Sequence, residues 1–326
     1  MEKNIELQNA WDFVEHTGIS IFLTGKAGTG KTTFLRTIKQ RSTKRMVVVA
    51  PTGVAAINAG GVTIHSFFQL PLSPFVPESM VKPRFEYSKQ KRKIMRTLDL
   101  LVIDEISMVR ADIMDAIDSV LRRFREHNKP FGGVQLLMIG DLQQLTPVVK
   151  PEEEELLGRY YNTPYFFDSK ALQSIQYVTI ELTKVFRQQD ETFINILNHF
   201  RDGNVTDDDF KTLNSRYQLN FKPEEGSDYI HLTTHNRIAD NINNNQLKQI
   251  ESEAYRFCAQ IEGQFPENNY PADYELTLKC GAQVIFIHND RFERYYNGKI
   301  GRITFINEDR ILVACPGDNE AIEVEP

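Results

Sequence analysis

Residues 25–32 constrain the fold of this chain more than any other part of its sequence. They read GKAGTGKT and match the pattern G-x-x-x-x-G-K-[ST] at every fixed position. A short apolar run at residues 19–24 predicts a strand before them, and a helical pattern follows from Lys31. In that setting, glycines let successive backbone N–H groups face a phosphate, and the helix N-terminus adds partial positive charge. The sequence therefore predicts a phosphate-binding P-loop; the alternative is a glycine-rich turn that matches by chance.

The first half of the chain alternates short apolar runs with helical patterns. Further strands are predicted at residues 46–50, 98–104, 134–139 and 177–182, with a helix at 111–125. Continuous apolar strands that alternate with helices indicate a parallel sheet covered on both faces. The second half repeats the pattern more loosely, with helices predicted at 191–201, 207–216 and 236–250 and strands at 229–233 and 282–287. We expect an α/β chain with two parallel-sheet domains.

Two segments interrupt this alternation. Residues 67–96 hold four prolines and a group of basic side chains, and we predict a small insertion there. From residue 289 the pattern changes to short strands with turns, which predicts the start of a small all-β module. The expected domains are a first domain at 1–66 and 97–181, the insertion at 67–96, an incomplete second domain at 182–288 and the β-module at 289–326. The basic residues of the insertion are Lys82, Arg84, Lys89, Lys91, Arg92, Lys93 and Arg96.

Composition and charge exclude little. The formal net charge is −6, which does not argue against nucleic-acid binding, because basic residues can gather in one groove. The three cysteines, Cys258, Cys280 and Cys315, lie far apart without a CxxC pair, so a zinc site or a disulfide framework is not expected. The sequence shows no charged-then-apolar leader and no apolar run of about 18 residues, so we expect a cytoplasmic, nucleoid-associated protein with no membrane partner.

An acidic pair, Asp104 and Glu105, ends one of the predicted buried strands. Beside a P-loop such a pair forms a Walker B site. Asp104 would hold Mg²⁺ through water, and Glu105 would orient and deprotonate the attacking water. Lys31 would reach the β- and γ-phosphates, and the Thr32 hydroxyl would bind Mg²⁺. The alternative is that both carboxylates cap the helix that follows.

Two further segments are candidates for contact with the γ-phosphate. Residues 140–147 read GDLQQLTP after the next predicted strand, and a polar amide there would sense whether ATP or ADP is bound. Arg187 lies just inside the second domain, where an arginine could reach across the cleft as arginine fingers do. The alternatives are an ordinary surface turn for the first segment and a surface ion pair for Arg187.

An ordered set of motifs makes the chain resemble superfamily-one helicases of the Pif and RecD-like branch, over about residues 5–305. The motifs are GKAGTGKT at 25–32, APTGVAA at 50–56, GVTIHSF at 61–67, VIDEISM at 102–108, GDLQQLTPV at 140–148 and FRQ at 186–188. SMVRAD at 107–112 is similar to the signature that follows the acidic pair in Pif-type enzymes. KCGAQV at 279–284 and NGKIG at 297–301 are similar to the second-domain core of the same family.

The resemblance implies a P-loop NTPase fold with two RecA-like domains, the second incomplete, and an SH3-like insertion beginning at about residue 289. It implies that Gln8 reads adenine, that Gln144 senses the γ-phosphate and that Arg187 reaches across the cleft. The nucleotide would also contact Asp104 and the P-loop residues Gly25, Ala27, Gly28, Thr29, Gly30, Lys31, Thr32 and Thr33.

For nucleic acid, the resemblance implies that single-stranded DNA faces Pro51, Thr52, Gly53, Thr63, His65, Ser66 and Phe67, with Thr234, His235 and Asn236 as further candidates in the second domain. Hydroxyls can bind phosphates, and flat rings can stack bases at about 1–3 kcal/mol per base. The basic insertion would separate the strands at a fork. The alternatives are core packing for Phe67 and His65 and a solvated helix face for the basic residues at 89–96.

The resemblance thus implies an ATP- and Mg²⁺-dependent DNA helicase that moves 5′-to-3′ on single-stranded DNA. Forked or G-quadruplex DNA would be further partners, and the protein would act as a monomer or as a dimer on DNA. The alternative is a nucleotide-gated binding protein without unwinding activity; a small-molecule kinase would need a second-substrate lid, which the sequence does not suggest. The family's last two motifs do not occur before Pro326. We therefore expect a protein ending there to bind nucleotide weakly and not to unwind duplex DNA.

Overall fold

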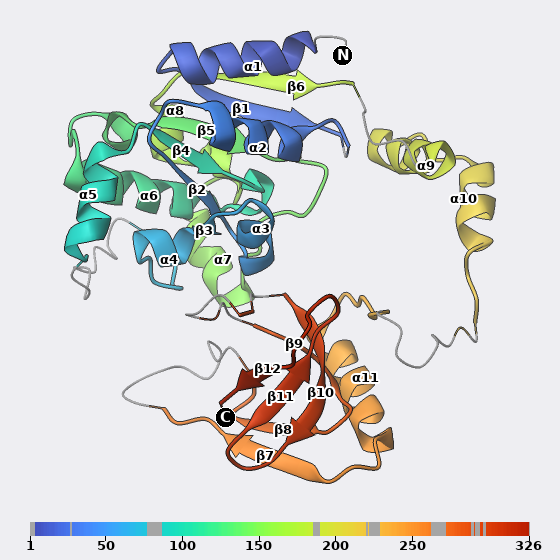
Figure 1. Ribbon diagram of the computed structural model, residues 1–326. Helices are drawn as coiled ribbons and strands as arrows, with labels where there is room; N and C mark the ends of the chain where they lie inside the picture. Colours follow the sequence, from blue (N-terminus) through green and yellow to red (C-terminus); the bar gives the residue numbers. More distant parts are fainter. Residues whose placement is uncertain are drawn as a thin grey trace. The chain divides into compact units, whose positions relative to one another are not determined.

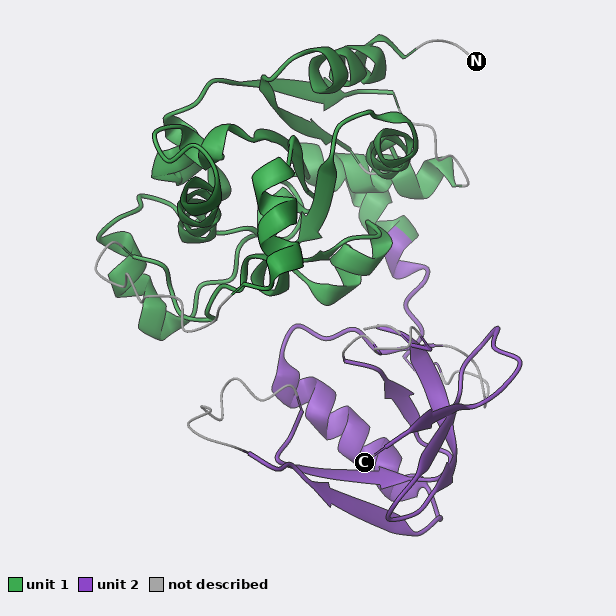
Figure 2. Ribbon diagram, turned by 60° about the vertical axis from the view of Figure 1, so that its left-hand side comes forward, with its two compact units in different colours: residues 1–212 green, residues 213–326 purple. Residues whose placement is uncertain are grey.

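The structure is a computed structural model, and it describes residues 4–26, 28–76, 87–184, 190–219, 221, 229–261, 272–287, 290, 294–295 and 298–325. The chain divides into two compact units, residues 1–212 and 213–326 (Figure 2). The P-loop and the acidic pair both belong to the first unit.

A six-stranded parallel sheet forms the centre of the first unit (Figure 1). In spatial order its strands are β3 (Val62–Thr63), β2 (Met46–Ala50), β4 (Leu100–Ile103), β5 (Gln135–Ile139), β1 (Ser20–Gly25) and β6 (Tyr177–Leu182). The strands predicted in the first half are confirmed, and the short β3 is an addition. Because the strands run parallel, the loops that follow them meet at one edge of the sheet.

Both faces of this sheet are covered, which explains why the inner strands β2 and β4 are apolar throughout. In β4, Leu101 and Ile103 belong to a core cluster that also holds residues of the helix α6, whereas Leu100 and Val102 belong to a second cluster with α1 and α2. Neighbouring residues of a strand point to opposite faces, so every position of β4 needs an apolar side chain. The helices of this unit are α1 (Ile5–His16), α2 (Lys31–Arg41), α3 (Gly53–Asn58), α4 (Ile64–Phe68), α5 (Lys89–Thr97), α6 (Ala111–Phe124), α7 (Pro151–Gly158), α8 (Lys170–Gln173), α9 (Glu191–Asp202) and α10 (Asp207–Asn214, which reaches into the second unit), with 3₁₀ turns η2 (Ile106–Met108), η3 (Pro130–Gly133) and η4 (Phe166–Asp168).

The described part of the predicted insertion packs into the first unit's core. Phe67, Phe68, Tyr87 and Met95 are buried members of the cluster that α6 covers. The Tyr87 hydroxyl donates a hydrogen bond of 2.6 Å to the backbone oxygen of Phe68. Residues near both ends of the predicted insertion therefore contribute to the first unit's core, and the bounds of the insertion stay a prediction. Residues 77–86 lie outside the described residues.

The second unit contains α11 (Asn236–Gln249) and strands that pair only antiparallel within the described residues. The strand β7 (Ala254–Cys258) pairs with β8 (Glu275–Lys279). A four-stranded sheet has the order β12-β11-β10-β9, with β9 (Gln283–Ile285), β10 (Ile300–Ile306), β11 (Ile311–Ala314) and β12 (Ile322–Val324). The strand predicted at 229–233 is wrong: its side chains Tyr229, Ile230 and Leu232 are exposed, and no described strand pairs with them. A second parallel sheet stays a prediction.

The second unit begins at Leu213 rather than near Leu182. The strand β6 pairs with β1 along its whole length, and α9 forms ion pairs with two loops of the first sheet. Both elements are therefore held by the first unit, although the apolar pattern alone suggested a new domain at this point.

The glycine after β5, Gly140, is required by close packing. A Cβ atom there would lie 2.8 Å from Ile106 Cγ2 and 3.1 Å from the backbone nitrogens of Ile106 and Ser107. We therefore expect Gly140→Ala to destabilise the protein by about 1–3 kcal/mol, the usual cost of forcing an extra carbon into a packed core. Urea unfolding measures the change. Gly158→Ala is the matched control, because nothing lies within 4 Å of the Cβ atom it adds. Equal unfolding midpoints for the two variants would contradict this packing.

Candidate functional site

The P-loop turns the chain sharply from β1 into α2. Gly25, Gly28 and Gly30 have φ angles of 147°, 78° and 97°, which residues with a side chain rarely adopt. Gly30 has a left-handed conformation and directly precedes α2. Because the loop follows the carboxyl end of β1, the unpaired N–H groups at the start of α2 lie at that edge of the sheet. Ala27 lies outside the described residues.

Lys31 is the first residue of α2, and its ammonium lies inside the loop. Its Nζ atom donates hydrogen bonds to the backbone oxygens of Gly25 and Lys26, at 2.5 and 3.1 Å. Burial lowers the pKa of Lys31, while the carboxylates of Asp141 and Glu105 act in the opposite direction. The strands β1, β4 and β5 thus bring a cation and several anions together at one point.

The acidic pair lies where β4 ends. Burial, together with the neighbouring charge of Glu105, raises the pKa of Asp104 to about 6. The backbone N–H of Glu105 donates to Asp104 Oδ1 at 3.1 Å. Glu105 has a φ of 52°, a left-handed conformation that is uncommon for a side-chain-bearing residue, and it makes no side-chain cap on η2. The helix-capping alternative is therefore not supported for Glu105.

Asp141, one residue after the required Gly140, organises the loop that follows β5. It is only 2% exposed, and its carboxylate accepts hydrogen bonds from Gln143 N at 3.1 Å, from Gln144 Nε2 at 3.2 Å and from Arg201 Nη1. Burial alone would raise the pKa of Asp141, but the bonds from Arg201 and Gln143 keep it below its ordinary value. The exposed amide of Gln144, predicted to sense the γ-phosphate, is thereby tied to this carboxylate.

Arg201 is a site residue that the sequence did not reveal. It lies near the end of α9, and its partner Asp141 is 60 positions earlier in the chain. No local motif marks it, so only the three-dimensional contact identifies it. Arg187, the arginine predicted to cross the cleft, lies outside the described residues.

The helix α1 carries Gln8, the residue predicted to read adenine. The Gln8 amide donates to Asp12 Oδ1 at 2.9 Å on the surface of the helix. Two residues earlier, the Glu6 carboxylate accepts hydrogen bonds from Thr183 Oγ1 at 2.6 Å and from Thr183 N at 3.0 Å, which lower the pKa of Glu6. These bonds fasten α1 to the end of β6.

The residues predicted to face single-stranded DNA in the first unit follow two neighbouring strands. Pro51, Thr52 and Gly53 come after β2, and Thr63 ends β3, which pairs with β2. The hydroxyl oxygens of Thr52 and Thr63 accept bonds from Ala55 N and Ser66 N and so cap the two short helices α3 and α4. Each hydroxyl hydrogen is still available to donate. The structure therefore gathers most of this predicted set at the carboxyl edge.

Phe67 departs from that set. It is 7% exposed, and its ring packs edge-on against Phe68 with centroids 4.9 Å apart. Lys91 Nζ lies 5.7 Å from the ring centroid of Phe67 and donates to the backbone oxygen of Ser66 at 2.8 Å. A buried ring cannot stack on a base, so the core-packing alternative is favoured, and Lys91 helps to hold α4 in place.

His65 is half-buried beside an ion-pair network. The Arg110 guanidinium donates to both carboxylate oxygens of Asp112, at 2.8 and 2.7 Å, and to Glu153 at 2.7 Å. Burial, and then the charge of Arg110, lowers the pKa of His65, while Asp112 opposes the shift. The imidazole is therefore neutral at pH 7.

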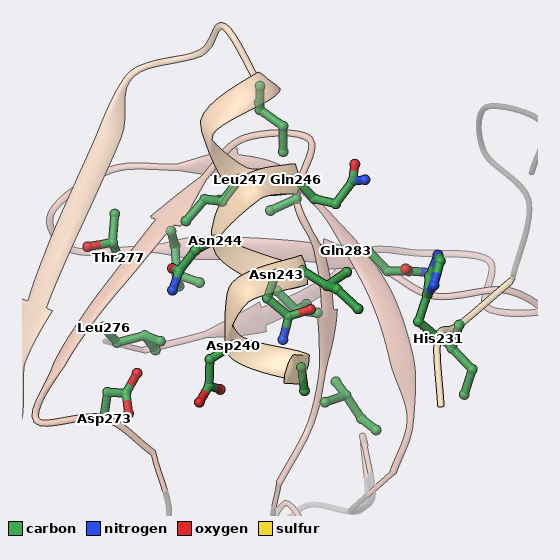
Figure 3. A pocket seen from close by; sticks show the side chains of 18 of the residues that line it. His231, Asp240, Asn243, Asn244, Gln246, Leu247, Asp273, Leu276, Thr277 and Gln283 are labelled. Carbon is green, nitrogen blue, oxygen red and sulfur yellow. The ribbon is translucent and has the colours of Figure 1, made fainter. Parts of the chain in front are cut away.

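The second unit holds the remaining candidates and a pocket. Thr234, His235 and Asn236 are exposed at the start of α11, where Thr234 Oγ1 lies 2.8 Å from His235 Nδ1. A cavity of about 580 Å³ lies between α11, β8 and β9 and is lined by Asn243, Leu247, Leu276 and Gln283 among others (Figure 3). None of the predicted nucleotide- or DNA-contacting residues lines it.

The described residues contain neither a cluster of metal ligands nor a membrane-spanning helix. No group of three or more His, Cys, Asp or Glu residues is arranged to hold a metal ion. Among the same residues, no helix is both long and apolar enough to span a membrane.

The parallel sheet, the P-loop and the acidic pair at its carboxyl edge define a P-loop NTPase with a RecA-like fold. A family model described as PIF1-like helicase matches residues 5–211, well over half of the chain. The chain belongs to the PIF1-like helicase family.

Named relatives agree with this placement. The ATP-dependent DNA helicase PIF1 of Candida albicans is 34% identical over 98% of the chain and 37% of that protein. The ATP-dependent DNA helicase Pif1 of Campylobacter jejuni is 31% identical over 92% of the chain and 70% of that protein. A crystal structure of Pif1 helicase from Bacteroides in complex with ADP-AlF3 and ssDNA is 39% identical, has a TM-score of 0.85 and covers 100% of this chain and 75% of that one. The chain spans 34–41% of the length of the first curated relatives it matches.

The lowered pKa of His65 predicts a pH effect on stability. The folded pKa lies below the ordinary value of 6.5, so protonation favours the unfolded chain. The resulting stability is present above that value and is lost as pH falls through the folded pKa. We expect wild type to lose more unfolding free energy than His65→Gln between pH 7.5 and about 5, in urea titrations at each pH. All other titrating groups are common to both proteins, so parallel curves would contradict the buried, neutral imidazole.

Proposed function

We propose that this chain provides the ATPase and single-strand-binding parts of an ATP-dependent helicase that moves along single-stranded DNA. The observation that carries the proposal is the convergence of Lys31, Asp104, Glu105 and Asp141 where β1, β4 and β5 end. Together these residues can bind a nucleoside triphosphate and activate a water molecule. The curated relatives named above are ATP-dependent DNA helicases.

Each nucleotide-site residue has a distinct proposed role. The Lys31 ammonium offsets the charge of the β- and γ-phosphates, and Glu105 takes the proton of the attacking water. Gln144 senses the γ-phosphate, and Gln8 reads adenine from α1. Arg187 supplies a cross-cleft charge to the transferring phosphoryl group. The P-loop residues from Gly25 to Thr33 cradle the phosphates with their backbone N–H groups.

Mg²⁺ is the metal that fits this site, held by Asp104 through water and by the Thr32 hydroxyl. Mg²⁺ prefers oxygen ligands and binds through one or two carboxylates plus substrate phosphates, so a cluster of three protein ligands is not required. The raised pKa of Asp104 fits a cation partner, because that carboxylate is buried beside a second negative charge. When bound, Mg²⁺ neutralises charge on the phosphates.

Single-stranded DNA is proposed to lie against Pro51, Thr52, Gly53, Thr63, His65 and Ser66. The strand β2 connects this surface to the nucleotide site, since Val49 pairs with Val62 on one side and with Ile103 on the other. The backbone N–H of Asp104 also donates to Val49 O at 2.9 Å. The residue of β2 that contacts the acidic pair, Val49, is therefore only two positions before Pro51, the first of the proposed DNA contacts. Thr234, His235 and Asn236 would add contacts from the second unit.

Movement 5′-to-3′ and strand separation at a fork complete the proposal. Lys89, Lys93 and Arg96 of α5 are exposed and can face duplex DNA, whereas Lys91 is engaged with Ser66. Lys82 and Arg84 lie outside the described residues. A solved structure named for DNA unwinding at forked dsDNA by two coordinating Pif1 helicases is 40% identical to the chain, with a TM-score of 0.86. This supports forked DNA as a partner and the action of two copies on DNA; action as a monomer and binding of G-quadruplex DNA stay predictions.

Variants of the two central residues test the nucleotide site. Glu105→Gln should bind ATP nearly as well as wild type and hydrolyse it roughly 10²–10⁴-fold more slowly, because it loses a positioned general base. Lys31→Ala should abolish hydrolysis. Binding of a fluorescent ATP analogue and phosphate release measure the two effects, with the exposed Glu154→Gln as the matched control. If Glu105→Gln lost ATP affinity and kept its rate, Glu105 would be a metal ligand instead.

A second pair of variants tests the DNA surface. Thr52→Ala should weaken single-stranded DNA binding by about 3- to 10-fold, the worth of one hydrogen bond of about 1 kcal/mol. Thr52→Ser keeps both the hydroxyl and the helix cap, and should bind like wild type. Fluorescence anisotropy with an oligo-dT probe measures the affinity, and ATP affinity without DNA should not change. Equal loss of DNA and ATP affinity in Thr52→Ala would indicate local misfolding and would contradict a DNA contact.

A further inference from the structure

The end of α9 is tied to two different nucleotide loops by two adjacent residues of opposite charge. Arg201 Nη1 forms an ion pair with Asp141 Oδ2 in the loop after β5. The next residue, Asp202, forms an ion pair of 3.1 Å with Lys26 of the P-loop. One helix end therefore contacts both loops that surround Lys31.

The two ion pairs differ in their burial. The side chains of Arg201 and Asp141 are 19% and 2% exposed, whereas those of Lys26 and Asp202 are 32% and 47% exposed. Solvent weakens an exposed pair, so Lys26 and Asp202 contribute little. Removing one partner of a buried pair leaves an uncompensated charge, so Asp141 depends strongly on Arg201.

Asp141 in turn holds the loop that carries Gln144, the residue proposed to sense the γ-phosphate. Its Oδ2 atom accepts both the Arg201 guanidinium and the Gln144 amide, and Oδ1 accepts Gln143 N. Asp141 and Arg201 also both act on the Lys31 ammonium, with opposite effects on the pKa of Lys31. Without Arg201, the Asp141 carboxylate would turn toward the remaining cation, Lys31, and would carry the Gln144 amide with it.

We infer that Arg201 is a positioning residue for γ-phosphate recognition, which holds Asp141 and, through it, Gln144 in place while α9 stays attached to the nucleotide loops. This inference rests on the proposed ATPase function. It gives α9 a direct connection to the phosphate-sensing amide, so that a change at the γ-phosphate reaches α9 through two side chains.

Arg201→Ala should therefore affect ATP and ADP differently. We expect the rate of ATP hydrolysis and the affinity for a non-hydrolysable ATP analogue to fall about tenfold, in the range found for residues that couple two sites. ADP lacks the γ-phosphate, so ADP affinity should stay within about twofold of wild type. Arg201→Lys keeps the charge and should recover part of the loss. Asp202→Asn removes the exposed pair on the same helix end and should leave all three quantities within about twofold.

A double-mutant cycle with Asp141→Asn shows whether the pair acts as one unit. Asp141→Asn should reproduce the Arg201→Ala pattern, and the double variant should be no worse than either single variant. If Arg201→Ala folds poorly, the double variant carries the test, because it leaves neither an unpaired carboxylate nor an unpaired guanidinium.

Two results would overturn the inference. The first is a wild-type ratio of ATP-analogue to ADP affinity in Arg201→Ala, whether or not both affinities fall. The second is an equal effect of Asp202→Asn, which would reduce Arg201 to a tether of α9. Failure of the proposed function itself would look different, because Lys31→Ala would then hydrolyse ATP like wild type.

Discussion

The parallel pairing of β1 with β5 and β6, and of β4 with β5, decides where every charged group of the site lies. The P-loop follows β1, the acidic pair follows β4, and Asp141 follows β5, so all of them meet at one edge. The strands β1, β4 and β5 are each buried on both faces. A shift of register by one residue would move side chains from one core cluster to the other, so the positions of the loops are fixed by the core.

Charge balance is the second constraint. Burial acts against each ion of the site, and the partners available decide which ions remain charged. The hydrogen bond from Arg201 helps to keep the pKa of Asp141 below its ordinary value, whereas burial and the charge of Glu105 raise the pKa of Asp104 to about 6. The opposite pKa shifts indicate different roles: Asp141 stabilises its loop, whereas Asp104 is suited to bind a divalent cation. Charge balance also explains why an arginine from a distant helix matters to the P-loop lysine.

The sequence predicted what is encoded locally. The glycines at 25, 28 and 30, the apolar runs of five strands and the acidic pair at 104–105 all depend on neighbouring residues, and they appear in the structure as expected. The contact of Arg201 with Asp141 spans 60 positions and follows no spacing rule, so it was missed. Phe67 fits a DNA-facing motif but is held in the core by Phe68 and Lys91, which a linear pattern does not reveal. The strand at 229–233 failed because an alternating apolar pattern needs a partner strand to become a sheet.

We propose that ATP hydrolysis at Lys31 and Glu105 is coupled through β2 to a surface that binds single-stranded DNA. The most direct test is the rate of ATP hydrolysis by this chain with and without a saturating oligo-dT strand, with a blunt duplex of equal length for comparison. The ratio of the two rates is informative even where the absolute rate is low. The account predicts that the rate rises steeply with the single strand and much less with the duplex. An ATP hydrolysis rate that is the same with and without single-stranded DNA would contradict it.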